Sequence, residues 1–170
     1  MTQDDIDKLL VDTLSRIRAK IALNINEKGL RASGKTEASM VIESDEYGAR
    51  LKGRPYFQSL ELGRSAGHTP RGFVYIIRQW IIDKGLAVRQ IPYVRQPSER
   101  WQPKYSVEER SLLAAAGAIA HTIRTRGTLL YRQGGRRDIY TPPIQEEIAR
   151  LATEIKAIIS RTIAENTHGR

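Results

Sequence analysis

Residues 36–62 read TEASMVIESDEYGARLKGRPYFQSLEL, and this stretch decides the fold class that the sequence predicts. Apolar and polar side chains alternate along residues 36–43, which is the two-residue period of a half-buried strand. Residues 47–52 and 56–62 also have strand character, and short turns rich in Asp, Gly and Pro separate the three segments. Because such short connections join antiparallel neighbours, we predict a meander of three to four strands.

Helical periodicity appears on both sides of this stretch. Residues 4–26 carry apolar side chains every three or four positions and begin with aspartates that complement a helix dipole. The same period recurs three times towards the C-terminus. It predicts further helices over residues 73–84, 107–126 and 143–165.

The helix and strand patterns together define the expected fold class. Ser106 and Glu109 form a capping box that starts the helix over residues 107–126. We predict a single α+β domain over residues 1–170. It combines an N-terminal helix, a small antiparallel sheet of three to four strands and two to three further helices.

Two segments lack a regular period. Residues 87–105 contain three Pro, four basic residues and the aromatic residues Tyr93, Trp101 and Tyr105. This composition indicates either a functional arm or a flexible segment, and the aromatic residues favour an arm that docks onto a partner. Residues 132–138 are rich in Gly and Arg and lie between two short segments, 129–131 and 138–140, for which we expect an extended backbone. We interpret residues 132–138 as the tip of a hairpin or of a second arm.

The positive charge of the chain is local. The chain has a net charge of +9, and residues 64–137 alone carry 14 basic and 4 acidic side chains, a net charge of +10. Twelve of the 14 basic residues are Arg, whose forked guanidinium pairs well with phosphate or carboxylate. The charge therefore fits an acidic partner, either nucleic acid or an acidic protein surface, and it also fits a solvated basic surface with no dedicated partner.

Composition excludes several classes of protein. The chain has no Cys, which excludes a disulfide framework, a Cys-ligated zinc site, an iron–sulfur cluster and a Cys nucleophile. No apolar run approaches the roughly 20 residues of a membrane-spanning helix. The acidic start of the chain is unlike a signal peptide. We expect a soluble, basic domain that is made in the cytosol.

Residues 29–36, GLRASGKT, match the phosphate-loop pattern GxxxxGK[ST]. A working phosphate loop lies between a buried strand and a helix, so that backbone N–H groups and the helix N-terminus hold the phosphates. Here the order is reversed, because an amphipathic helix precedes the loop and a strand-like alternation follows it. We interpret residues 29–36 as a polar connection between a helix and a strand.

No group of residues indicates catalysis or a metal site. His121 lacks an acidic or His partner one helical turn away, and His68 lies in a loop. The strand residue Glu61 and the capping residues Glu108 and Glu109 suggest no acid–base pair. We therefore predict no enzyme activity and no cofactor.

Five segments, taken in order, resemble a known family. They are residues 30–36, 55–64, 78–85, 126–128 and 134–140. Together these segments resemble the neck or tail-completion proteins of tailed bacteriophages and prophages, particularly those of Bacteroides-type hosts. In that family a helix precedes a small antiparallel sheet, and a Y-x-x-x-L-E-x-G segment closes one strand. In this sequence the matching residues are Tyr56, Leu60, Glu61 and Gly63.

The resemblance implies a non-enzymatic virion protein that is made in the host bacterial cytoplasm. It implies a homo-oligomeric ring between the portal or head connector and the tail tube or terminator proteins, with genomic DNA passing through the lumen. The contacts that we expect with neighbouring subunits or partners come from the two arms, with Trp101 as the main anchor. They are Tyr93, Arg95, Trp101, Arg136 and Arg137.

An alternative function follows from the charge alone. A nucleic-acid-binding protein could use the Arg-rich segment 64–137, in which aromatic residues accompany the arginines. No helix-turn-helix, zinc-finger or RNA-recognition signature accompanies this segment. Both functions remain open on the sequence.

Overall fold

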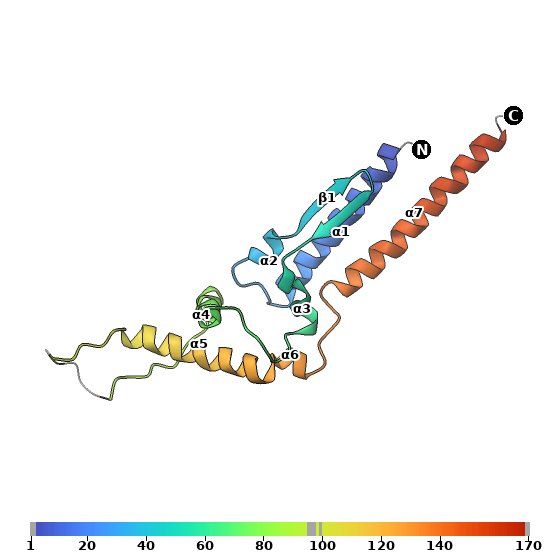
Figure 1. The fold of residues 1–170 in the computed structure, drawn as a ribbon. Coiled ribbons are helices and arrows are strands. Elements are labelled where there is room, and N and C mark those ends of the chain that lie inside the picture. The colour runs from blue at the N-terminus through green and yellow to red at the C-terminus, as the bar shows by residue number, and fades with distance from the viewer. Residues whose placement is uncertain (1–2, 95–97, 99, 169–170) are drawn as a thin grey trace. The chain divides into compact units, whose positions relative to one another are not determined.

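The computed structural model describes residues 3–94, 98 and 100–168 (Figure 1). The chain divides into two compact units, and unit 2 is inserted into the sequence of unit 1. Unit 1 comprises residues 1–62 and 136–170, and unit 2 comprises residues 63–135. The single domain expected over residues 1–170 stays a prediction.

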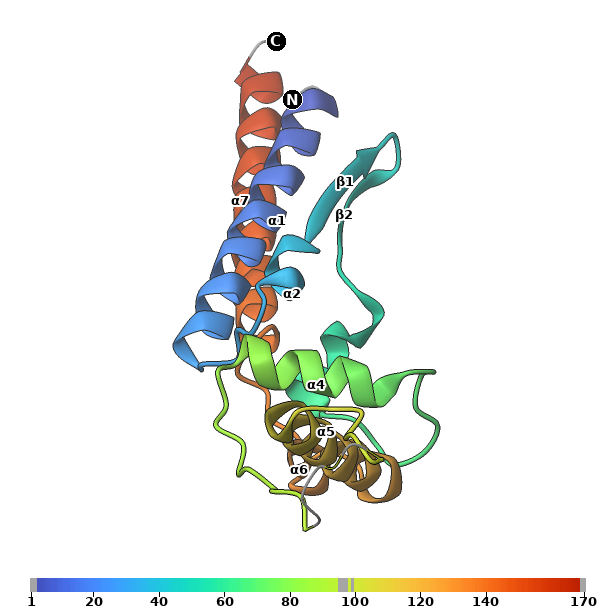
Figure 2. The same ribbon diagram turned by 90° about the vertical axis from the view of Figure 1, so that its left-hand side faces the viewer.

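Two long helices form the framework of unit 1. Helix α1 (Gln3–Glu27) packs against helix α7 (Thr141–His168), and Figure 2 shows them side by side with both chain ends at the same end of the pair. The pair is therefore antiparallel. Both helices confirm the sequence prediction, although α7 extends beyond the expected range at each end.

The core of unit 1 lies beneath the C-terminal half of α1. Its buried apolar residues come from α1, from the connection before the sheet and from the segment before α7. They are Ile17, Ile21, Ile25, Met40 and Ile139. The apolar stripe recognised in residues 4–26 is thus the face of α1 that packs into the core.

The sheet of unit 1 is a single hairpin. Strand β1 (Val41–Asp45) pairs antiparallel with β2 (Gly48–Lys52), with Val41 opposite Lys52 and Asp45 opposite Gly48. The backbone N–H of Tyr47 donates to Oδ1 of Asp45 at 3.0 Å and closes the turn. The described residues thus form an antiparallel sheet of two strands, and the prediction of three to four strands was wrong.

The segments wrongly expected as strands form short helices. Residues 55–62 form a 3-10 turn, η1 (Pro55–Gln58), followed by α3 (Ser59–Leu62). Phe57 and Leu60 are three residues apart, and both pack against the core of unit 1, so the helical spacing outweighs the alternation. Helix α2 (Lys35–Ala38) replaces the start of the strand expected over residues 36–43. Helix α6 (Leu129–Arg132) forms where residues 129–131 were expected to be extended, and residues 138–140 form bends.

Unit 2 consists mainly of helix α4 (Phe73–Asp83) packed against helix α5 (Val107–Arg126). Both helices confirm the predicted ranges to within one residue. The Ser106 hydroxyl accepts the N–H of Glu109 at 3.1 Å, as the capping box predicted. The core is formed by Ile77, Ile81, Ala116 and Ala120, in which the small residues of α5 let α4 approach closely.

Candidate functional site

The described part of the aromatic arm, residues 87–94, 98 and 100–105, folds back onto the start of α5. The Tyr93 hydroxyl donates to the carbonyl of Tyr105 at 2.8 Å, and the Trp101 ring meets the Tyr93 ring edge-on at 5.6 Å. The Arg110 guanidinium lies 4.6 Å from the centre of the Tyr93 ring. It also donates to the carbonyl oxygens of Ile91 and Pro92, each at 3.0 Å.

Ser111 and a small backbone bridge complete this anchoring. The Ser111 hydroxyl accepts the N–H of Ile91 at 2.7 Å and donates to the carbonyl of Val107 at 2.6 Å. Ser98 and Trp101 exchange two backbone hydrogen bonds of 2.8 and 3.0 Å. Half-buried Tyr93 and Trp101 therefore hold the arm together as well as presenting surface to solvent.

The remaining expected contact residues do not belong to this cluster. Arg95 lies outside the described residues. In unit 1, the backbone N–H of Arg136 donates to the carbonyl of Glu61 at 2.8 Å, and its Nε donates to the carbonyl of Leu60 at 3.1 Å. Arg136 is thus engaged within its own unit. Arg137 is exposed, and its guanidinium pairs with none of the described side chains.

Glu61 has a role that sequence reasoning missed. It is 1% exposed, and its Oε1 accepts the backbone N–H groups of Ile139, Tyr140 and Thr141 at 2.8, 2.7 and 2.9 Å. Its Oε2 accepts the hydroxyl of Thr141 at 2.5 Å. Glu61 therefore caps α7 from a position about 80 residues earlier in the chain.

The electrostatics of Glu61 agree with this structural role. Burial raises the pKa of its carboxyl. The hydrogen bonds from Thr141, Ile139 and Tyr140 together lower the pKa by more than burial raises it, so that the pKa lies below the ordinary value. The positive end of the α7 dipole favours the same charged form. Glu61 is therefore a cap that is charged at neutral pH, and the L-E-x-G segment was the only signal for it in the sequence.

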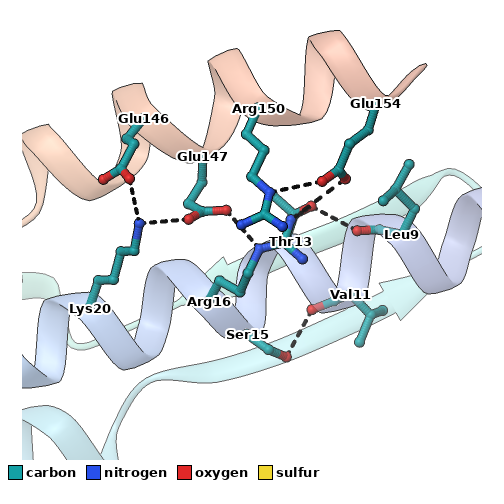
Figure 3. Close-up of polar contacts among 10 residues, drawn as sticks. All are labelled: Leu9, Val11, Thr13, Ser15, Arg16, Lys20, Glu146, Glu147, Arg150 and Glu154. Carbon is teal, nitrogen blue, oxygen red and sulfur yellow. Dashed lines mark hydrogen bonds and ion pairs between the residues drawn. The ribbon is translucent and has the colours of Figure 1, made fainter. Parts of the chain in front are cut away.

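A second buried carboxylate joins α1 to α7 (Figure 3). Glu147 is 1% exposed, and its two oxygens lie 2.7 Å from Nε of Arg16 and 2.8 Å from Nζ of Lys20. Lys20 and Arg16 lower the pKa of the Glu147 carboxyl through these contacts. The exposed Glu146 also pairs with Lys20 at 2.8 Å. These pairs set the register of the two helices.

An apolar groove opens between α1, α7 and the β1–β2 hairpin of unit 1. Its volume is about 520 Å³, and almost all of its lining is apolar. Leu10 and Leu14 of α1, Leu51 of β2, and Ile148 and Leu151 of α7 contribute to it. Ile148 remains 55% exposed, so this groove is an incompletely covered face of the protomer.

Helix α4 of unit 2 carries apolar side chains on its outer face as well as on its core face, beside the polar residues Arg78, Gln79 and Asp83. Large apolar side chains of a helix are normally buried. Here five large apolar side chains on or directly after α4 are 40–65% exposed. They are Tyr75, Ile76, Trp80, Ile82 and Leu86, which we call the α4 face.

Unit 2 also carries the positive charge. Residues 63–135 contain 12 basic and 4 acidic side chains, a net charge of +8. Several of its arginines are exposed and form no ion pair with any side chain in the described part of the chain. They are Arg71, Arg89, Arg100, Arg124, Arg126 and Arg132.

The segment that matches the phosphate-loop pattern is closed by its own side chains. The guanidinium of Arg31 lies against Gly34, which has a φ of 72°, and pairs with Glu37 at 3.8 Å. The strand expected over residues 36–43 begins only at Val41, because α2 forms over its first residues. Helix α1 precedes the loop, so no strand delivers it as a phosphate loop requires.

Comparisons with protein-family models, with curated proteins and with solved structures found no match to this chain. Within the described ranges, no three His, Cys, Asp or Glu side chains gather closely enough to hold a metal ion. None of the helices in those ranges has the length and hydrophobicity needed to cross a membrane.

Proposed function

We propose that this chain is a structural subunit of a tailed-phage neck, which forms a homo-oligomeric ring between the portal or head connector and the tail. The order of the motifs in residues 30–140 suggests the neck. Among the described residues, the two most buried carboxylates support a structural role, because Glu61 caps α7 and Glu147 pairs α1 with α7. Neither is placed for acid–base chemistry.

The observation that carries the proposal is the open apolar groove of unit 1. A groove of about 520 Å³ with an apolar lining is costly to leave in water, and burying it in an assembly recovers that free energy. A subunit of a ring has such surfaces on its two sides, and each side is covered by the neighbouring copy. The groove thus supports assembly more directly than any feature supports catalysis.

Electron microscopy of the purified chain tests the proposal, alone and mixed with the portal and tail proteins of a tailed phage. The expected result is closed rings of uniform diameter, or a defined complex with one of those proteins. Monomers in every sample would contradict the proposal. A ring that binds neither the portal nor any tail protein would agree with ring formation but contradict the proposed place in the phage neck.

The charge of unit 2 favours nucleic-acid binding as a second candidate function. Its net charge of +8 and the exposed arginines of α5 and α6, among them Arg124, Arg126 and Arg132, could contact phosphates. Fluorescence anisotropy with duplex DNA tests this function. If unit 2 binds nucleic acid, its binding to the duplex should weaken steeply between about 50 and 200 mM salt. No binding at the lower salt concentration would contradict it.

A further inference from the structure

We infer that the α4 face of one copy docks into the apolar groove of unit 1 on a neighbouring copy. This inference rests on the proposed ring and names its subunit interface. The α4 face projects large apolar side chains, and the groove is an apolar recess of about 520 Å³. Neither surface is fully covered within its own unit, and each has the chemistry that the other requires.

The lengths of the two surfaces match. Helix α4 has 11 residues and is therefore about 16 Å long at 1.5 Å per residue. On α1 the lining of the groove runs from Leu10 to Ile21, which is also about 16 Å of helix. A helix of the length of α4 can thus lie along the groove without leaving part of it empty.

The charges around the two surfaces are complementary. Residues 63–135, which carry the α4 face, have a net charge of +8. On unit 1, residues 1–15 contain four Asp and one Lys, and the hairpin residues 41–52 contain three acidic and two basic side chains. These two segments border the groove and have net charges of −3 and −1. Unit 1 as a whole has a net charge of +1, so the attraction for unit 2 of another copy is local to these two segments.

The geometry of such a contact suits a ring. The two surfaces lie on different units and are different patches of the chain, so the contact is heterologous. A heterologous contact leaves one free groove and one free α4 face on every dimer, and repeated addition closes into a ring when the rotation permits. A self-complementary contact would instead stop at a dimer.

Cross-linking between two different single-cysteine variants tests the inference. The chain has no Cys, so each introduced thiol is the only one in its molecule. Trp80→Cys places a thiol on the α4 face, and Leu14→Cys places one in the groove. A short bis-maleimide linker added to an equal mixture should yield a covalent dimer whose intact mass corresponds to one copy of each variant.

A matched control replaces the groove variant. Ala157→Cys is exposed on the same helix pair but is not part of the groove lining, and it should cross-link to Trp80→Cys at least tenfold less than Leu14→Cys does. Equal yields with both partners, or products that contain two copies of Trp80→Cys alone, would overturn the inference. A double variant that cross-links within one chain at high dilution would also overturn it.

A second measurement separates this inference from the proposed function. Trp80→Asp should raise the concentration at which half of the chain assembles by about tenfold or more, because a central aromatic anchor is lost. Leu129→Asp alters another exposed apolar side chain of unit 2 and should have no such effect. If Trp80→Asp forms rings as well as the wild type does, the proposed contact between the α4 face and the groove is contradicted, but the ring is not. If the wild-type chain never assembles, the proposed ring itself is contradicted.

Discussion

Glu61 shows how one residue joins distant parts of unit 1. Its carboxylate accepts three backbone N–H groups and one hydroxyl from residues 139–141, and its carbonyl accepts the N–H of Arg136. These contacts join the two segments of unit 1 that lie immediately before and after unit 2 in the sequence. The residue is therefore positioned for structure, although a buried carboxylate is often a sign of catalysis.

Glu61→Gln should lower the free energy of unfolding by about 1–3 kcal/mol, because the amide removes the charge and presents donors to buried N–H groups. Glu46→Gln, an exposed change in the hairpin turn, should stay within about 0.5 kcal/mol of the wild type. Urea unfolding followed by circular dichroism measures both variants. Equal stability of Glu61→Gln and the wild type would contradict the capping role.

The pKa values of Glu61 and Glu147 predict a loss of stability in acid. In the folded state both carboxyls have a pKa below their ordinary value. Their contribution is therefore present above the unfolded pKa of about 4.3 and is lost as the pH falls through the folded pKa. Urea unfolding at a series of pH values should show this loss, and the double variant Glu61→Gln/Glu147→Gln should show a shallower one. Parallel pH profiles would be inconsistent with this explanation.

At the scale of elements, the pairing of α1 with α7 depends on a polar seam beside an apolar core. Arg16 and Lys20 approach Glu147 from α1, and Arg150 and Glu154 continue the seam along α7 (Figure 3). Glu147 is buried, whereas its neighbour Glu146 is largely exposed. Because buried ion pairs are screened less by solvent, Glu147 should contribute much more to the free energy of unfolding than Glu146 does.

Glu147→Gln and Glu146→Gln form a matched pair of variants. The first should lower the free energy of unfolding by about 1–3 kcal/mol, since it weakens contacts with two cations in a buried site. The second should change it by no more than about 0.5 kcal/mol. Thermal and urea unfolding of both variants provide the measurement. A larger loss from Glu146→Gln would refute the proposed seam.

Gly63 and Gly117 predict opposite effects of the same substitution. At Gly63 the backbone φ is 69°, and an added Cβ would lie 2.5 Å from the backbone nitrogen of Tyr131. Gly63→Ala should therefore destabilise the protein by at least about 1–2 kcal/mol. Gly117 lies within α5 with open space around it, so Gly117→Ala should stabilise by about 0.5–1 kcal/mol. Unfolding curves that shift in the same direction for both would disprove this reasoning.

The long helices could be predicted from the sequence, whereas the short ones could not. Helices α1, α5 and α7 span many turns, so their period is unmistakable, and Ser106 marks the start of α5. Residues 55–62 contain two helices of four residues each, which is too short for a period to emerge. There the alternation of side chains suggested a strand, and only the packing of Phe57 and Leu60 in the core decides the structure.

The candidate surfaces were predictable only in part. The aromatic composition of the arm pointed to Tyr93 and Trp101, and the structure brings these two residues together. Arg110, which stacks on Tyr93, was missed because its partner lies 17 positions earlier in the chain. The groove arises from three separate elements, so no local pattern in the sequence could reveal it.

At the scale of the whole molecule, the chain presents two units with different surface chemistry. Unit 1 offers the apolar groove, and unit 2 combines the α4 face with most of the positive charge. A protein with this division can bind one copy of itself through each unit. The net charge of +9 is therefore as consistent with assembly as with binding of nucleic acid.

Ring assembly can be tested by native mass spectrometry of the wild-type chain over a concentration series, with and without a phage portal protein. One closed oligomer of fixed copy number should replace the monomer as the concentration rises, or the chain should bind the portal protein with a fixed stoichiometry. A chain that stays monomeric at every concentration and in both samples would contradict the proposed ring.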